Sequence, residues 1–259
     1  MVSSLNITNR HGLVVQGHSP GATVLLPTTG GVNVLHLTGS DFVTLRGFQL
    51  GDAARTVVPN VGILVAQAAG GNEGSSRIVV DNLQVTGRYG IASVYNFGVA
   101  ESSIRDSAFW QFLPNSTAPA VIFTSDNRNG VASAFATIAT GGGHYPADWT
   151  LSAVGLHNNS APSGPTQGVV FVCRACTSFR MLGGVVAGAG PALILFEGEG
   201  ANIPMFISFI GTGFYSDNGT PPSTMFLAIS SVYGLGVSMA SFDYSCCLSS
   251  GPGTITWFQ

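Results

Sequence analysis

The sequence predicts an all-β chain folded as a parallel β-helix, a solenoid of about eight stacked coils. The first observation is a pattern of alternating apolar residues that recurs along the chain, each time with one extra residue that breaks the alternation. The second is a short β-prone run that precedes each copy of this pattern. The third is that no segment shows the 3.6-residue period and the capping residues of a helix. The repeating unit is therefore made of strands and turns alone.

The recurring pattern is clearest in FVTLRGFQL, residues 42–50. Val43 and Leu45 alternate, then one beat is skipped and the apolar residues resume at Phe48 and Leu50. One strand would keep its alternation, so the skip predicts a corner between two strands that face one interior. The other six copies fill the four inward places with Ile78, Val80, Leu83 and Val85; Ser102, Ile104, Ser107 and Phe109; Trp149, Leu151, Val154 and Leu156; Phe179, Met181, Gly184 and Val186; Ile207, Phe209, Thr212 and Phe214; and Val237, Met239, Phe242 and Tyr244.

A further strand is predicted before each corner, usually after glycine or proline. These runs are residues 34–37, 62–66, 90–94, 120–123, 168–172, 191–196 and 224–229, and a looser first coil is readable at 12–26. Since one coil cannot bury its apolar side alone, stacked coils share one core. We predict a β-helix domain over residues 1–245 with an inserted loop at 124–147, which is longer than usual structureless connections. Residues 246–259 are predicted to be an end coil or a docking segment.

The composition excludes several classes of protein. Charged residues make up only 8% of the chain, against about 25% in an average globular protein, and the net charge is −3. That charge provides no basic field for nucleic acid. No window approaches the ~18 unbroken apolar residues of a membrane-spanning helix. The mean hydropathy of +0.37 is high, so either much of the chain is core or much of its surface is covered by partners.

The four cysteines do not suggest a metal site. Cys173 and Cys176 form a CxxC, but zinc needs two more ligands at a workable spacing. The adjacent Cys246 and Cys247 fit poorly as the second half. We therefore expect free thiols in or near the core, and no metal or cofactor.

The segments LVVQG…ATVLL, VLHLTGSDFVTLRGFQL and RIVVDNLQVTGRYGIASVYN resemble the pectate-lyase-like superfamily. The resemblance covers about residues 10–245. It implies a right-handed single-stranded parallel β-helix and, most closely, a bacteriophage tailspike or capsule depolymerase that acts on polysaccharide in a virion or extracellular setting. Together with the low charge, the resemblance also implies a homotrimer. The pectinases of the superfamily are less similar, because lysine and the strings NTD and DD are absent.

One set of candidate catalytic acids lies late in the chain. Glycosidase chemistry needs two carboxyl groups about 5–10 Å apart. Glu197 and Glu199, in FEGEG, directly follow a predicted strand, and Asp217 lies in the next turn region. Since the chain has only 12 acidic residues, two within three positions form a candidate catalytic pair.

A second set comes from stacking the corners. The alignment places Arg46, Asp81 and Arg105 at equivalent positions on successive coils, about 4.8 Å apart. This column is an ion ladder, which on a surface contributes little to stability. Asp106 lies one position further along, at the corner, and Glu101 lies near the start of the same coil. Asp81, Glu101 and Asp106 are therefore the alternative catalytic set.

Sugar-binding sites also present exposed aromatic side chains. Trp110 follows the inward Phe109 and is expected to face outward, and Tyr89 lies near a turn. We expect Trp110, Tyr89 and Glu101 to line a shallow groove, with Arg105 as a further substrate-binding residue. Cover by a neighbouring subunit is the alternative explanation of the same side chains.

Three functions stay open at this point. The favoured one is a virion-associated receptor-binding protein, a tailspike or fibre subunit that recognises a host cell-surface polysaccharide and contacts other virion proteins. Whether it also cleaves the polymer is left open. The first alternative is a polysaccharide lyase or glycoside hydrolase of pectinase type. The second alternative is a purely structural virion spacer.

Overall fold

The computed structural model describes residues 2–54, 56–66, 76–114, 116–124, 146–159, 169–174, 176–188, 192–198, 205–216, 224–230, 238–243, 246–248 and 256–258. For residues 97, 192, 197–198, 205 and those after 215 it describes the backbone alone. The regular secondary structure in these ranges consists of β-strands alone. The described segments accordingly include no helix that could span a membrane.

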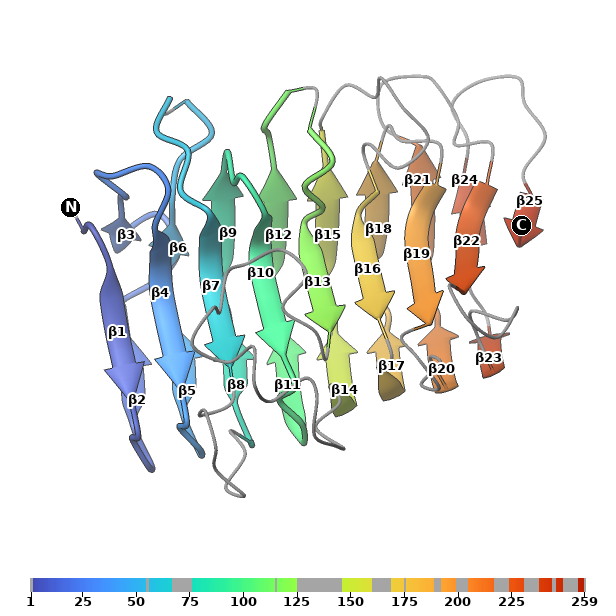
Figure 1. The fold of residues 1–259 in the computed structure, drawn as a ribbon, viewed down its shortest axis with the longest axis horizontal. Helices are drawn as coiled ribbons and strands as arrows, with labels where there is room; N and C mark the ends of the chain where they lie inside the picture. Colours follow the sequence, from blue (N-terminus) through green and yellow to red (C-terminus); the bar gives the residue numbers. More distant parts are fainter. Residues whose placement is uncertain are drawn as a thin grey trace.

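Three parallel sheets run the length of the molecule, and each coil adds one strand to each sheet (Figure 1). Sheet 1 consists of β1 (Leu5–Thr8), β4 (Asn33–Thr38), β7 (Val61–Ala66), β10 (Ala92–Phe97), β13 (Val121–Thr124), β16 (Phe171–Arg174), β19 (Ala192–Gly198), β22 (Thr224–Ser230) and β25 (Thr256–Phe258). Sheet 2 consists of β2 (Val14–Gln16), β5 (Thr44–Arg46), β8 (Val79–Asp81), β11 (Ser102–Arg105), β14 (Ala147–Ser152), β17 (Thr177–Leu182), β20 (Met205–Ile210) and β23 (Ser238–Asp243). Sheet 3 consists of β3 (Val24–Leu25), β6 (Gln49–Leu50), β9 (Gln84–Gly87), β12 (Ala108–Gln111), β15 (Gly155–Asn158), β18 (Val185–Gly188), β21 (Gly213–Ser216) and β24 (Cys246–Leu248).

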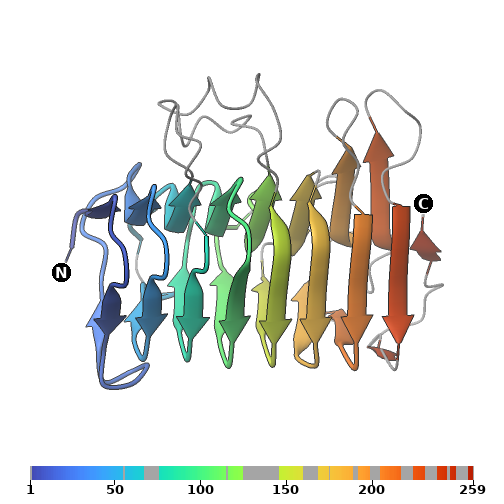
Figure 2. The same cartoon turned by 90° about the horizontal axis from the view of Figure 1, so that it is seen from below.

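The chain winds through the sheets in the order 1, 2, 3 and advances by one coil per turn (Figures 1 and 2). The winding is right-handed, as crossovers between parallel strands almost always are. The described strands form eight three-stranded coils, and β25 adds one more strand to sheet 1. The prediction of a right-handed parallel β-helix of about eight coils is confirmed. The domain boundary at 245/246 stays a prediction, and residues 125–145 of the predicted loop lie outside the described ranges.

The break in the apolar alternation corresponds to one residue in the left-handed conformation at the corner between sheets 2 and 3. In coil order these corner residues are Gly47, Asn82, Asp106, Ala153, Gly183 and Gly211, and φ lies between 48° and 69° at each. The corner N–H donates to a carbonyl of the next coil, as from Asn82 to Arg105 at 3.1 Å. One such residue turns the chain so that inward residues on both sides of it, such as Leu45 and Phe48, face the same core.

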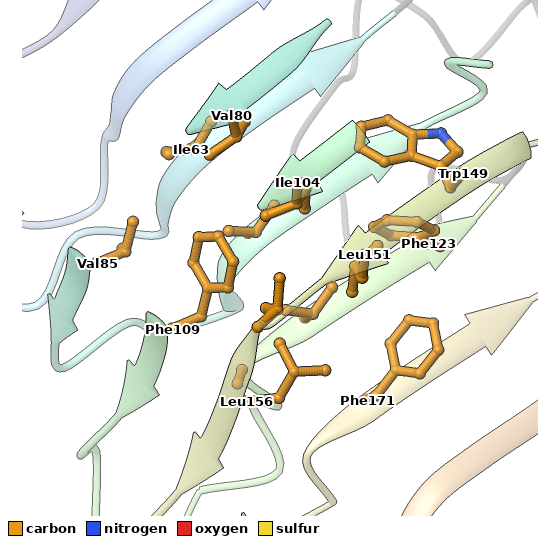
Figure 3. Packing of buried hydrophobic residues seen from close by; sticks show 14 of the residues in the cluster. Ile63, Val80, Val85, Ile104, Phe109, Phe123, Trp149, Leu151, Leu156 and Phe171 are labelled. Carbon is orange, nitrogen blue, oxygen red and sulfur yellow. The ribbon is translucent and has the colours of Figure 1, made fainter. Parts of the chain in front are cut away.

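The inward places of the pattern build one continuous core. Figure 3 shows Ile104 and Phe109 of one coil meeting Leu151 and Leu156 of the next in the same interior. All four are at most 1% exposed. Trp149 is also in the core at 2% exposure, and its Nε1–H donates to a backbone carbonyl of the preceding coil at 2.6 Å.

Two inward places carry serine instead of an apolar residue, and both hydroxyls serve the corners. Ser102 Oγ accepts a hydrogen bond from the N–H of Ile78 at 2.9 Å. Ser107 Oγ accepts one from the N–H of Leu83 at 3.0 Å. A buried backbone N–H without a partner is costly, so the two serines satisfy donors of the preceding coil at points where its chain bends.

The expectation of free thiols is wrong for Cys173 and Cys176, which form a disulfide. Cys173 lies on β16 and Cys176 directly precedes β17, so the corner between sheets 1 and 2 brings them together. Their Cα atoms are 5.7 Å apart, within the range that a disulfide spans. Both are fully buried. The side chains of Cys246 and Cys247 lie outside the description.

The outer face of sheet 1 is also apolar and buried. A second hydrophobic cluster lies there: Val61, Leu64, Ala66, Ala92, Tyr95, Ile122, Val169, Val172 and Leu195. Strands of a parallel sheet that is buried on both faces lose their alternation of polar and apolar residues, and β7 is buried at all six positions. Sheet 1 therefore offers no open polar face over these coils, and a surface site must involve sheet 2 or sheet 3.

We expect Gly183→Ala to lower the free energy of unfolding by about 1 kcal/mol, roughly 2–4 °C in Tm. A Cβ at this position meets no atom within 4 Å, so the cost is the positive φ of 65° alone. The matched opposite is Ala153→Gly, at the same corner position one coil earlier with φ of 53°, which should raise Tm. Thermal unfolding followed by circular dichroism measures both. Equal melting temperatures for the three proteins would show that the corner stores no strain.

Candidate functional site

The outward side chains of sheet 2 form a flat surface that faces solvent. From β5 to β20 they alternate with buried inward residues, whereas the inward Val15 of β2 is only partly buried. We call this surface the sheet 2 face. Coil by coil its residues are Val14 and Gln16; Phe42, Thr44 and Arg46; Arg77, Val79 and Asp81; Glu101, Ser103 and Arg105; Asp148, Thr150 and Ser152; Ser178, Arg180 and Leu182; and Phe206, Ser208 and Ile210.

One edge of this face is a column of residues at the corner between sheets 1 and 2. Phe42, Arg77, Glu101, Asp148 and Phe206 stand in this column, and each has a φ between 51° and 55°. Arg77 Nη2 lies 3.1 Å from Glu101 Oε2, and its guanidinium lies 4.8 Å from the centroid of the Phe42 ring. Phe42 and Phe206 are each 53% exposed. The edge thus combines two solvent-facing aromatic rings with a charged centre.

The opposite edge contains the predicted ion ladder, and the register of the column is confirmed. Arg46 and Arg105 are the strand partners of Asp81 on either side. Arg105 donates to both carboxylate oxygens of Asp81 at 3.0 Å, and this hydrogen bond and charge raise the pKa of Arg105. Arg46 turns away and donates to Gln16 at 2.7 and 3.1 Å. The column is therefore one ion pair and one Arg–Gln pair rather than a continuous ladder.

The alternative catalytic set, Asp81, Glu101 and Asp106, is not gathered at one point. Glu101 precedes β11 at one corner, whereas Asp106 follows β11 at the other. Five residues of extended chain separate them by about 16 Å, well beyond the separation that glycosidase carboxyls need. Asp81 and Asp106 lie near each other on adjacent coils, but Arg105 already binds Asp81 through both carboxylate oxygens.

The first catalytic set stays a prediction. Glu197 lies at the end of β19 with its backbone paired to Arg174 and Ile229, while its side chain is outside the description. Glu199 and Asp217 lie outside the described residues altogether. The structure places none of the three carboxylates.

Tyr89 does not line a surface groove, and that prediction is wrong. Its side chain is fully buried and its hydroxyl donates to the carbonyl of Leu50 at 3.3 Å. Burial raises the pKa of this phenol. Gln111, which is also buried, binds the N–H and the carbonyl of Tyr89 at 3.0 and 2.8 Å. The nearby glycines were the missed signal, because a Cβ at Gly51 or Gly62 would lie only 2.6 or 3.1 Å from the Tyr89 side chain.

Trp110 faces outward as predicted, but from sheet 3, on another side of the helix from Glu101. It belongs to two outward columns on coils three to five, which we call the sheet 3 patch: Thr86, Arg88, Trp110, Phe112, His157 and Asn159. The ladder continues one residue beyond the strands, since the N–H of Phe112 donates to Gly87 and that of Asn159 to Gln111, both at 2.9 Å. This places the second column, Arg88, Phe112 and Asn159, beside the first.

The rings of the sheet 3 patch are parallel. His157 stacks on Trp110 with centroids 3.7 Å apart and an angle of 3°, and Phe112 lies 5.8 Å from Trp110 at 5°. Burial lowers the pKa of His157 to about 4. Thr86 Oγ1, Arg88 Nε and one further buried oxygen of the patch have no hydrogen-bond partner. Each buried polar atom without a partner lowers the free energy of unfolding by about 1–3 kcal/mol. The patch holds more such atoms than any other part of the described surface.

Sequence reasoning missed two charged residues of the sheet 2 face. Asp148 and Arg180 stand on successive coils, are exposed, and take part in none of the ion pairs between described residues. The ion pairs there are Arg77–Glu101 and Arg105–Asp81, and His11 contacts Asp41 through its ring nitrogen. Extending the corner alignment to Asp148 and Arg180 would have found both. No group of three or more His, Cys, Asp or Glu side chains in the described ranges is arranged to hold a metal ion.

The chain matches no protein-family model, and no curated protein matches its sequence. Two solved structures from Azotobacter vinelandii are similar in shape. The mannuronan C-5 epimerase AlgE4 A-module has a TM-score of 0.35 and 10% identity, covering 100% of this chain and 87% of that chain. The AlgE6 A-module has a TM-score of 0.31 and 9% identity, covering 100% and 89%. Likenesses at this level carry no argument about function, and the fold assignment rests on the strand register described above.

We expect acid to destabilise the protein through His157. Its folded-state pKa of about 4 lies below the unfolded value of about 6.5, so the unfolded state binds more protons between these values. Stability is therefore lost as the pH falls from 6.5 to 4, by about 1–2 kcal/mol after allowing for partial solvent exposure. Urea unfolding at pH 7, 5.5 and 4.5 measures the loss.

The control variant is His157→Phe, which keeps a ring on Trp110 but cannot titrate. It should show a shallower dependence on pH, with a remainder from His36, whose pKa is also lowered by burial. If His157→Phe and the parent protein lose the same stability between pH 7 and 4.5, the assignment to His157 fails.

Proposed function

We propose that the chain is a receptor-binding subunit of a virion tailspike or fibre, and that it binds a host cell-surface polysaccharide along the sheet 2 face. One observation carries the proposal. Within the described ranges, the outward residues of sheet 2 are uncovered over seven successive coils, whereas the outer face of sheet 1 is apolar and buried. Seven coils at about 4.8 Å give an open face about 30 Å long.

A repeating surface suits a repeating ligand. The middle column of the face carries the hydroxyls of Thr44, Ser103, Thr150 and Ser208, one coil apart except where Val79 and Arg180 interrupt it. Hydroxyls both donate and accept hydrogen bonds, as sugar hydroxyls do. Weak contacts of this kind add up when one long polymer meets several of them at once. The exposed phenylalanines at the edge supply apolar contact.

Binding is favoured over cleavage by the state of the carboxylates. Asp81 and Glu101 are each paired with an arginine, so the carboxylate oxygens that hydrolysis would need are already occupied by contacts within the chain. One arrangement supports an enzyme as the second candidate. Glu101 and Asp148 directly precede the paired residues Ser102 and Trp149, so they stand on neighbouring coils. A glycoside hydrolase of this chain would use that pair.

The virion setting is supported by the composition and by the disulfide. With 8% charged residues and a mean hydropathy of +0.37, the chain suits a surface shared with sister subunits. The buried Cys173–Cys176 bond suits an oxidising, extracellular setting. We propose a homotrimer in contact with other virion proteins.

We expect Thr150→Arg to weaken binding to the recognised polysaccharide at least tenfold. Thr150 is central to the sheet 2 face, and a long side chain there blocks the path of a polymer. Ala54→Arg adds the same charge at an exposed turn outside this face and should leave the affinity unchanged. Glycan-array or surface plasmon resonance measurements with bacterial capsule and lipopolysaccharide preparations compare the three proteins. Equal affinity for Thr150→Arg and Ala54→Arg contradicts the sheet 2 face as the site.

Light scattering and reducing-end release complete the test of function. A trimer that binds without releasing reducing ends supports an adhesin. Release that is lost in Glu101→Gln and Asp148→Asn would establish the hydrolase instead. A chain that binds none of the preparations overturns the proposal and leaves the structural spacer.

A further inference from the structure

The sheet 3 patch contains shielded polar atoms that no other group in the description satisfies. Thr86 is only 9% exposed and its Oγ1 has no partner, and Arg88 Nε and Asn159 Oδ1 are in the same state. Buried polar side-chain atoms in folded proteins nearly always have a hydrogen-bond partner. Three unpartnered atoms on six neighbouring residues point to a group that the described residues do not supply.

The same patch offers a flat apolar wall. Trp110 has His157 stacked on one face, and the strand partner on its other side is the small Thr86. The neighbouring Phe112 ring is parallel to the indole. The face of Trp110 toward Thr86 therefore borders a position where the preceding coil has no ring of its own. A sugar ring has this combination of needs, an apolar C–H face for stacking and hydroxyls for hydrogen bonds.

The charge of the patch is positive, and no residue in the described ranges compensates it. Arg88 makes no ion pair with any described residue, and a guanidinium stays charged in a protein. Its planar fork of donors matches a carboxylate or a phosphate. None of the other five residues of the patch is acidic, so an anion has no competitor within it.

We propose that the sheet 3 patch is a separate site for a sugar ring with one anionic group, a carboxylate or a phosphate. Arg88 binds the anion, the face of Trp110 toward Thr86 stacks on the ring, and the Thr86 hydroxyl and the Asn159 amide bind ring hydroxyls. His157 holds Trp110 in position from behind. The site does not rest on the sheet 2 face, which belongs to another side of the helix.

Tryptophan fluorescence and calorimetry with small probes test this site. Glucuronic acid or glucose 6-phosphate should quench the fluorescence saturably, whereas glucose should not. The chain has two other tryptophans, Trp257 and the buried, hydrogen-bonded Trp149. Trp110→Phe therefore identifies the quenched residue, because it should abolish the quenching while the fluorescence of the other two remains. Arg88→Gln should weaken binding of the anionic sugar at least tenfold. Arg46→Gln removes the same charge from the sheet 2 face, and Thr150→Arg adds one there. Both variants should leave the quenching by the anionic sugar unchanged.

Three results would overturn the proposal: equal affinity for glucose and glucuronic acid, unchanged affinity in Arg88→Gln, or equally tight binding of acetate and inorganic phosphate alone. If circular dichroism shows that Arg88→Gln does not fold, Thr86→Val decides. That variant deletes the unpartnered hydroxyl at nearly constant volume, so it should melt at a higher temperature and bind the anionic sugar more weakly. A higher melting temperature with unchanged affinity would mark Thr86 as structural and the site as wrongly assigned.

Discussion

The single left-handed residue between sheets 2 and 3 is the constraint on which the rest of the molecule depends. Because this residue makes the turn in coils two to seven, each of these coils leaves sheet 2 and enters sheet 3 at the same point relative to its neighbours. The N–H of that residue bonds to the next coil, so the corner also takes part in the ladder that stacks the coils. Two strands with a wider loop between them would lose this alignment, and side chains would no longer stand in columns.

Columns of side chains are the direct consequence, and they explain both candidate surfaces. Residues far apart in the sequence, such as Asp81 and Arg105, become neighbours at the spacing of one coil. The same stacking aligns the hydroxyls of the sheet 2 face and the rings of the sheet 3 patch. A residue on such a surface acts together with those above and below it. The chemistry of such a residue therefore depends on its neighbours on adjacent coils rather than on its neighbours in the sequence.

The three sheets differ in what covers them, and this difference assigns their roles. Sheet 1 is apolar on both faces, which stabilises the fold but leaves no open polar surface over the central coils. Sheet 2 pairs most of its charges with one another, so it is hydrophilic without a strong field. Sheet 3 retains shielded polar atoms without partners beside aromatic rings. An arrangement that costs stability without contributing to the core is typical of a binding site.

The sequence by itself determined the fold class and the core. The period of apolar residues is a local property, and a strand or a corner can be recognised from the few residues that form it, as with Val43, Leu45, Phe48 and Leu50. The tertiary structure decided the partners, because coils of unequal length hide which residues stack. It turned Tyr89 inward into space left by glycines, joined Cys173 to Cys176, and separated Glu101 from Asp106 by placing them at opposite ends of one strand. Contacts between coils depend on the length and path of the chain that connects one coil to the next, and no local pattern of residues encodes that path.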